Sequence, residues 1–231
     1  ALNNYLDCPK KYFYKNLLRI PDSYSPSLKF GNIVDFALNN FFEKSKKESK
    51  ICAKKVLIDE FEKGLRKFNF SEKDEEKFRK RGEQALSDYY DEYSGNWTSK
   101  VNTQFMIQRD FELKTKDILR ISGIIDKIEY IDGLFSPNIN VIDHKTGKAF
   151  SEITKDRKDN YERQLVFYKL LLTNYEKKDF KINKSVLDFV EKNKKGKFEK
   201  YSLEVTEEHL SKLQEEINTC AEGVLSMEFL K

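Results

Sequence analysis

Apolar and polar residues recur with the period of an α-helix through most of the first hundred residues. The longest such segments, each predicted to be one helix, span Ser27 to about Lys47, Ile51–Phe68 and Glu75–Tyr93. The third follows a typical helix start from Ser71 to Asp74. A short aromatic helix, interrupted at Cys8-Pro9, is predicted before a loop from Pro21 to Pro26. Residues 1–100 are therefore predicted to form a mainly helical part.

The pattern then changes to a period of two, which is typical of β-strands. The predicted strands are Thr103–Leu113, Leu119–Tyr130, Ile139–Lys145, Ser185–Val190 and Phe198–Val205, the last two forming a hairpin. Helical spacing returns at Asp156–Tyr175, and Thr206 is expected to cap a final helix that ends near Leu225. This order predicts an α/β fold in a single domain, with a central mixed sheet flanked by helices in residues 101–231 and a helical part in residues 1–100.

Two aspartates and one lysine lie at the ends of two apolar, β-branched runs. Asp126 ends the first run, while Asp143 and Lys145 end the second and, being two apart, should project from the same strand face. Turn residues from Ile131 to Asn138 make the two strands neighbours, which brings Asp126 close to that pair. Clustered carboxylates repel one another unless a cation lies between them, and hard divalent cations prefer oxygen ligands. The pattern indicates a metal-dependent phosphodiesterase in which the lysine orients a water or stabilises phosphoryl charge.

Composition narrows the class of protein only a little. The 231 residues are 39% hydrophobic and 35% charged, enough for a real core beneath a strongly charged surface, and the net charge of +4 does not by itself indicate nucleic-acid binding. Three scattered cysteines give no disulfide framework, and no apolar run is long enough to span a membrane. We therefore expect a cytoplasmic protein with no membrane partner. Its ends suggest a domain taken from a longer polypeptide.

Five short motifs together resemble the PD-(D/E)xK nuclease superfamily, and in particular its RecB-like branch. They are Cys8-Pro9 with Tyr12 and Tyr14, Gly31 to Asp35, Gly123 to Asp126, Asp143 to Gly147, and Gln164 to Tyr168. An Asp-x-Lys triplet alone is common by chance and can equally be a surface ion pair. Five motifs in the right order are far more specific, and they extend over nearly the whole chain. The resemblance implies a restriction-endonuclease-like core.

The resemblance also implies a role for each matched residue of the strands. Asp126 and Asp143 match the two metal-binding carboxylates. Lys145 matches the lysine that positions the water nucleophile or stabilises the transition state. The backbone carbonyl of His144 matches a further metal ligand, whereas its imidazole, on the opposite strand face, is expected to pack or to lie at the surface.

Other matched positions lie on helices. Gln164 and Tyr168, four residues apart, can reach the same site and match a contact to substrate or to metal-coordinated water, although Tyr168 can instead belong to the core stripe of its helix. The superfamily typically has a histidine four residues after the glycine equivalent to Gly31, where this chain has Asp35. An aspartate can still bind Mg²⁺ or Mn²⁺, but the change can also mark a loss of activity.

An iron–sulfur cluster is not expected in this chain. Some relatives combine a cysteine at the position of Cys8 with three cysteines near the C-terminus to hold such a cluster. Cys52 lies in the helical part and Cys220 stands alone, so four suitably placed ligands do not exist in this sequence. Cys8 is then expected to pack between helices.

The function implied is hydrolysis of DNA phosphodiester bonds with Mg²⁺ or Mn²⁺, by an exonuclease of DNA repair or recombination that can work with a helicase domain or subunit. Tyr12, Tyr14, Lys10 and Lys11 can flank a single-strand channel, although aromatic residues at helical spacing more often belong to a core. One alternative is a catalytically impaired, nuclease-like module that binds DNA without a divalent ion. Another is a purely structural interaction domain, which leaves the carboxylate–lysine cluster unexplained.

Overall fold

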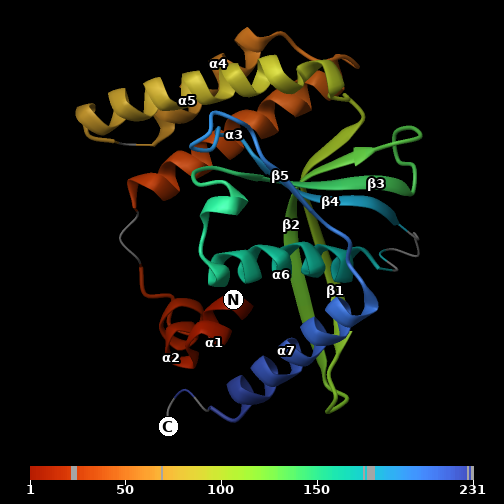
Figure 1. Ribbon diagram of the computed structural model, residues 1–231. Coiled ribbons are helices and arrows are strands. Elements are labelled where there is room, and N and C mark those ends of the chain that lie inside the picture. Colours follow the sequence, from red (N-terminus) through yellow and green to blue (C-terminus); the bar gives the residue numbers. More distant parts are fainter. Residues whose placement is uncertain (22–24, 69, 174, 176–179, 228, 230–231) are drawn as a thin grey trace.

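The computed structural model describes residues 1–21, 25–68, 70–173, 175, 180–227 and 229, and Figure 1 shows its elements. The α-helices are α1 (Leu2–Asp7), α2 (Pro9–Tyr12), α3 (Pro26–Lys47), α4 (Lys54–Lys67), α5 (Glu72–Tyr93), α6 (Lys155–Leu172) and α7 (Glu207–Leu225). Shorter helical turns are η1 (Phe13–Leu17, a π-helix), η2 (Ser94–Asn96) and η3 (Phe150–Glu152). The strands are β1 (Val101–Glu112), β2 (Ile118–Tyr130), β3 (Asn138–Lys145), β4 (Lys181–Phe189) and β5 (Lys200–Leu203).

The five strands form one mixed sheet in the order β1-β2-β3-β4-β5. Neighbouring strands are antiparallel except for β3 and β4, which are parallel. A parallel pair requires a crossover connection, and α6 lies in the segment that links β3 to β4. The predicted α/β fold with a central mixed sheet is therefore confirmed.

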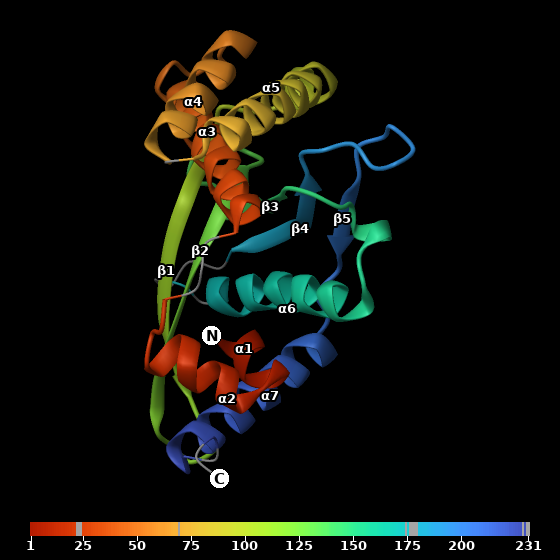
Figure 2. The same ribbon diagram turned by 90° about the vertical axis from the view of Figure 1, so that its left-hand side faces the viewer.

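The longer helices lie in two groups, α3–α5 and α6–α7 (Figures 1 and 2). Each group contributes to a hydrophobic core of its own. The first core joins α6 and α7 to the sheet and includes Leu165, Leu171 and Leu213. The second core joins α3, α4 and α5 and includes Phe41, Phe61 and Leu86. In both views α1 and α2 lie beside α7 rather than with α3–α5. The residues before the predicted loop are thus separate in space from the rest of the helical part.

The first strand changes the core that it contacts halfway along its length. Val101 belongs to the core of α3–α5, whereas Ile107 belongs to the core of α6 and α7. Residues an even number apart on a regular strand would lie on the same face. Gln104, between them, has a φ of +47°, a left-handed conformation that is uncommon for a residue with a side chain. This backbone irregularity accompanies a reversal of side-chain direction along β1.

The second strand reverses at the corresponding point. Gln104 lies opposite Asp126, between the regular pairs on either side. On one side of Asp126, the ammonium of Lys127 lies over the ring of Phe42, in α3, at 4.0 Å. On the other side, Ile125 belongs to the core of α6 and α7, although it is two residues from Lys127. Asp126 is therefore placed where the sheet passes from one core to the other.

Several predicted helix starts are confirmed by their capping contacts. Ser71 Oγ accepts a hydrogen bond from the backbone N–H of Asp74 at 3.2 Å, and Thr206 Oγ1 accepts one from the backbone N–H of His209 at 3.4 Å. In the predicted loop before α3, Ser25 caps the helix and Pro26 already belongs to it, while residues 22–24 lie outside the described part of the chain. Within the described ranges, none of the helices combines the length and apolar character that crossing a bilayer requires.

Two details of the sequence interpretation are wrong. Cys8 is exposed, and it adopts an extended backbone between α1 and α2, directly before Pro9. Its predicted role in helix packing is therefore incorrect. The fourth strand begins at Lys181 rather than Ser185, because its first residues pair with β3 while several of their side chains remain exposed. Such a segment lacks the apolar alternation that predicts a strand.

Candidate active site

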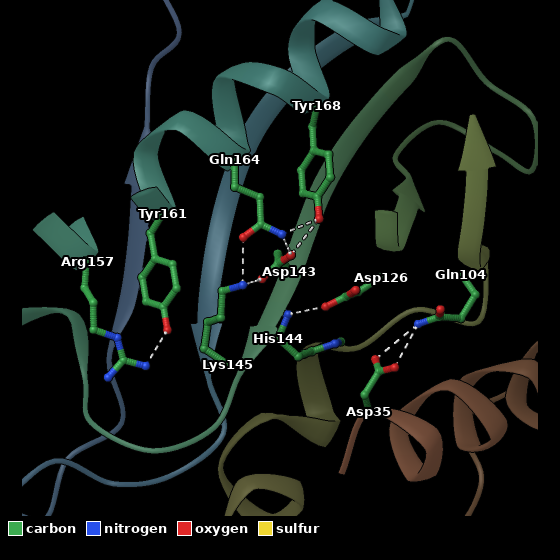
Figure 3. A network of polar contacts seen from close by, with 10 residues as sticks. All are labelled: Asp35, Gln104, Asp126, Asp143, His144, Lys145, Arg157, Tyr161, Gln164 and Tyr168. Atoms are coloured by element: carbon green, nitrogen blue, oxygen red, sulfur yellow. Dashed lines mark hydrogen bonds and ion pairs between the residues drawn. The ribbon is translucent and has the colours of Figure 1, made fainter. Parts of the chain in front are cut away.

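The two strand-end aspartates lie next to each other, as the sequence predicts. Lys127 of β2 pairs with Ile142 of β3, so the next residues along, Asp126 and Asp143, face each other across the two strands. The backbone N–H of His144 donates a hydrogen bond to Asp126 Oδ2 at 2.9 Å (Figure 3). This contact fixes the Asp126 carboxylate against the backbone of the neighbouring strand.

Lys145 and Asp143 form an ion pair on the same strand face. Lys145 Nζ lies 2.5 Å from Asp143 Oδ2, which confirms that the two side chains project together. The Asp143 side chain is 2% exposed and the Lys145 side chain 16% exposed, so water screens this pair weakly. Lys145 Nζ also lies 4.7 Å from the centroid of the Tyr161 ring. The ammonium is thus held between a carboxylate and an aromatic face.

Gln164 and Tyr168 reach this pair from α6. Gln164 Nε2 donates to Asp143 Oδ1 at 2.7 Å, and Gln164 Oε1 accepts from Lys145 Nζ at 2.8 Å. The Tyr168 hydroxyl donates to Asp143 Oδ1 at 2.7 Å (Figure 3). Tyr168 is only 4% exposed and belongs to the core of α6 and α7, so its ring packs in the core while its hydroxyl reaches the site. The core interpretation of Tyr168 is confirmed, and its contact to substrate or to metal-coordinated water remains a prediction.

Asp35 approaches the same site from α3. Gln104 Nε2, at the reversal of β1, donates to both carboxylate oxygens of Asp35, at 3.2 and 3.1 Å (Figure 3). Burial and, secondly, the charge of Asp143 raise the pKa of Asp35 to about 6. Burial, followed by the charges of Asp143 and Asp35, raises the pKa of Asp126 to about 8. The three carboxylates therefore repel one another, and a bound cation would relieve that repulsion.

The donor set fits a hard divalent cation. Asp35, Asp126 and Asp143 offer carboxylate oxygens from three different elements. Asp143 Oδ2 is buried and accepts no hydrogen bond from the described residues, and its charge is offset by the ion pair with Lys145. In the part of the chain that the structure describes, no three His, Cys, Asp or Glu side chains already lie together as a finished metal site.

The imidazole of His144 packs on the other side of its strand, as predicted. Its ring stacks with that of Phe42, with 6.3 Å between centroids and 9° between planes. Burial, and then the charge of Lys127, hold the pKa of His144 well below its usual range, so the ring is neutral. The side chain does not join the carboxylates. The ligand role predicted for the His144 carbonyl remains a prediction.

A second set of contacts holds the loop that follows Lys145. The carboxylate of Glu191 accepts hydrogen bonds from Arg81 Nε and Nη2, both at 2.7 Å, and from the backbone N–H of Gly147. The Arg81 guanidinium lies over the ring of Phe30 at 4.2 Å. We call this set the Arg81–Glu191–Gly147 bridge. It connects α5 to the loop directly after the candidate catalytic lysine.

Sequence reasoning missed the bridge and two neighbours of the site. Tyr161 precedes Gln164 by three residues on α6, so helical spacing offered a signal that could have found it. Gln104 carries no such signal, because a left-handed conformation is unusual for glutamine. Arg81 and Glu191 are 110 residues apart in the chain, and only the tertiary fold brings them together.

Comparisons with known proteins show the family to which the chain belongs. Residues 1–230 match the model of the PD-(D/E)XK nuclease superfamily, so the chain belongs to that superfamily, whose members generally use divalent metal ions. A solved structure named "Putative exonuclease", from Eubacterium rectale, is 17% identical and has a TM-score of 0.59, with 97% of this chain and 79% of that chain covered. Another, SSO0001, is 14% identical with a TM-score of 0.40, covering 94% of this chain and 83% of that chain. A comparison with curated proteins gives no match.

Proposed function

We propose that this chain is a metal-dependent deoxyribonuclease of the RecB-like branch that cleaves DNA as an exonuclease. The observation that carries the proposal is the buried Asp143–Lys145 pair, held by Gln164 beside Asp126 and Asp35. The order of the five sequence motifs supports the branch. The same resemblance supports a role in DNA repair or recombination and a helicase domain or subunit as partner.

The residues divide the chemistry between them. Asp126 and Asp143 are the proposed ligands of Mg²⁺ or Mn²⁺, with Asp35 and the His144 carbonyl completing the set. When bound, the ion supplies Lewis-acid polarisation of the phosphoryl group and lowers the pKa of water. The Lys145 ammonium would donate to the attacking water or to a phosphoryl oxygen. Gln164, 2.8 Å from Lys145 Nζ, would hold the ammonium in place.

The test is cleavage of end-labelled single- and double-stranded DNA in Mg²⁺, Mn²⁺ or EDTA. We expect cleavage that requires the ion and that is lost in Asp143→Ala and Lys145→Ala. The matched control is Asp59→Ala, which removes an exposed aspartate of α4 that pairs with Lys55 on the same helix. Unchanged cleavage by either site variant would contradict the role assigned to the substituted residue.

A second function, a catalytically impaired DNA-binding module, is favoured by one observation. Asp35 lies at the position where the resemblance to the superfamily leads us to expect a histidine. Such a module would bind DNA equally well in EDTA and in Mn²⁺ and would not cleave it. Restoring the usual histidine with Asp35→His would then show whether that residue alone accounts for the loss.

A further inference from the structure

A large cavity lies beside the candidate catalytic cluster. It has a volume of about 1010 Å³, is open to solvent on one side and is lined by residues of α1, α2, α6, α7 and the first half of β2. Figures 1 and 2 show α1 lying below α6 and beside α7. A volume at the upper end of the usual range for ligand pockets, roughly 300–1,000 Å³, is far more than a metal ion and its waters require.

The cavity is continuous with the catalytic cluster. Gln164 lines it and also contacts both Asp143 and Lys145. Tyr161 lines it as well, and its ring lies 4.7 Å from Lys145 Nζ. An occupant of the cavity would therefore be a direct neighbour of a phosphodiester held at the lysine.

The side-chain walls combine flat aromatic rings with few free charges. Tyr12, Tyr161 and Phe167 contribute rings to the lining. Of the charged residues in the lining, Arg163 is paired with Glu216 and Arg120 with Asp110. Asp117 adds one carboxylate, which accepts a hydrogen bond from Thr115. A lining of this kind suits an uncharged, flat group better than a phosphate.

A strand edge supplies polar groups along the same cavity. Successive residues of β2, from Ile118 to Ser122, line it whichever face their side chains occupy. This is expected if the cavity follows the edge of the strand. In the described structure β3 pairs with β2 only from Lys127 to Tyr130, so the backbone groups of the earlier residues that point away from β1 have no strand partner. Such N–H and C=O groups match the donors and acceptors on the edges of nucleobases.

We propose that the cavity receives unstacked bases of the DNA strand being cut, on one side of the scissile phosphate. This inference rests on the proposed nuclease function and makes its substrate more specific. Aromatic rings stack on bases of any sequence, and paired bases inside a duplex are not available to enter. Cleavage is then restricted to single-stranded DNA or to ends that can open. An extended peptide pairing with the β2 edge is less favoured, because its binding would not require Gln164 and Tyr161 to contact both the cavity and the catalytic lysine.

Two variants fill the cavity without touching the catalytic residues. Leu119→Trp fills it from β2, where Leu119 is half-buried on the same strand face as Ile121, and Ala221→Trp fills it from α7. The matched controls are Gln108→Trp, at an exposed position of the neighbouring strand β1, and Thr219→Trp, at an exposed position of α7; neither residue lines the cavity. Using two variants from different elements keeps the test valid if one of them fails to fold.

The substrates are a fluorescent hexathymidylate and bis(p-nitrophenyl) phosphate, a phosphodiester that has no base. We expect each cavity variant to lower kcat/KM for the oligonucleotide about tenfold or more, with little change for the small substrate and none in the controls. Oligonucleotide cleavage at the wild-type rate by both variants would overturn the proposal while leaving the nuclease assignment standing. Failure of the wild type to cleave either substrate would instead count against the proposed function.

Binding of the same oligonucleotide in EDTA, measured by fluorescence anisotropy, gives a readout that does not depend on cleavage. We expect about tenfold weaker binding in both cavity variants. Equal binding by the wild type and the variants would overturn the proposal. So would amide-exchange protection of Ile118–Ser122 by a capped Thr/Val pentapeptide but not by the oligonucleotide, because the cavity would then accept a protein strand.

Discussion

Asp35 is the residue of the proposed ligand set that departs from the pattern of the superfamily. The resemblance leads us to expect a histidine at this position, and Asp35 reaches the site from α3, whereas Asp126 and Asp143 come from the sheet. Gln104 holds it by two hydrogen bonds, and the charge of Asp143 contributes to its raised pKa. Asp35 lies close enough to Asp143 for their charges to interact. This supports a role for Asp35 as a metal ligand, and not as the trace of a lost activity.

Removing the charge of Asp35 should weaken ion binding. We predict that Asp35→Asn lowers the Mn²⁺ affinity about tenfold or more, since the charge of the ligand set tunes the affinity of oxygen sites. Asp35→His should retain binding through its ring nitrogen. The measurement is Mn²⁺ titration followed by electron paramagnetic resonance, with Asp59→Asn as the control. Wild-type affinity in Asp35→Asn would show that this carboxylate is not a ligand.

The raised pKa values of Asp35 and Asp126 predict how stability depends on pH. Both groups bind their proton more tightly in the folded state, with pKa values of about 6 and about 8 against the ordinary aspartate value of 3.8. Ionising them therefore opposes folding, and the ion-free protein should lose stability as the pH rises from about 4 to about 8. Saturating Mg²⁺ should restore that loss at pH 8 and have little effect at pH 5.

The measurement is the thermal midpoint across this pH range, in EDTA and in Mg²⁺. Asp126→Asn provides the comparison, because an amide cannot ionise and the variant should show a shallower decline. A wild-type curve that rises from pH 5 to pH 8 in EDTA, relative to the curve of Asp126→Asn, would contradict the assigned repulsion.

At the scale of elements, the reversal of β1 and β2 decides where the carboxylates meet. Gln104 bears the left-handed backbone and also binds Asp35, so one residue couples the strand geometry to the site. Asp126 lies opposite it. In a regular hairpin, side chains an even number of residues apart all lie on one face. Without the reversal, the apolar residues of β1 and β2 could therefore not pack into both cores.

Substitutions at Gln104 should separate backbone strain from side-chain contact. We predict that Gln104→Val lowers the free energy of unfolding by about 1–3 kcal/mol, because a β-branched residue tolerates a φ of +47° poorly. Gln104→Gly should be close to neutral, since glycine adopts this φ freely but loses the contact to Asp35. Urea unfolding measures both, with Gln108→Val as a control on the same strand. Equal stability of the two Gln104 variants would contradict this account.

The Arg81–Glu191–Gly147 bridge belongs to the same scale. Arg81→Lys removes the two-point contact to Glu191, which an ammonium cannot reproduce. Because small misplacements near the chemistry are costly, we expect kcat for DNA cleavage to fall about tenfold to a hundredfold with little change in KM. Arg79→Lys is the matched control, since Arg79 lies on the same helix but pairs with Glu62 and Glu75. An equal loss in both variants would point to a general effect on α5.

The sequence predicts the elements and the centre of the site better than its surroundings. The strands are recognisable because their apolar alternation is strong, and Asp143 and Lys145 are two residues apart on one of them. Asp35 could be assigned to the same site only through the family resemblance, because no local sequence pattern relates a helix residue to the end of a distant strand. The reversal at Gln104 and the contact between Arg81 and Glu191 depend on backbone strain and tertiary packing, neither of which has a sequence signature.

At the scale of the whole molecule, the site lies where the two cores meet. α3 contributes Asp35 from the core of α3–α5, while α6 contributes Gln164 and Tyr168 from the other core. The sheet between them carries Asp126, Asp143 and Lys145. An ion held by Asp35, Asp126 and Asp143 would therefore also connect the two helical groups through the sheet.

The most direct test of the central claim compares ion occupancy with DNA cleavage in one titration. Mn²⁺ binding, followed by electron paramagnetic resonance, and the initial rate of cleavage of end-labelled DNA would be measured on the same samples of the wild type and of Asp143→Ala. We predict that both rise with the same half-saturation in the wild type and that both are lost in the variant. Cleavage at full rate in EDTA, or in Asp143→Ala, would contradict the account.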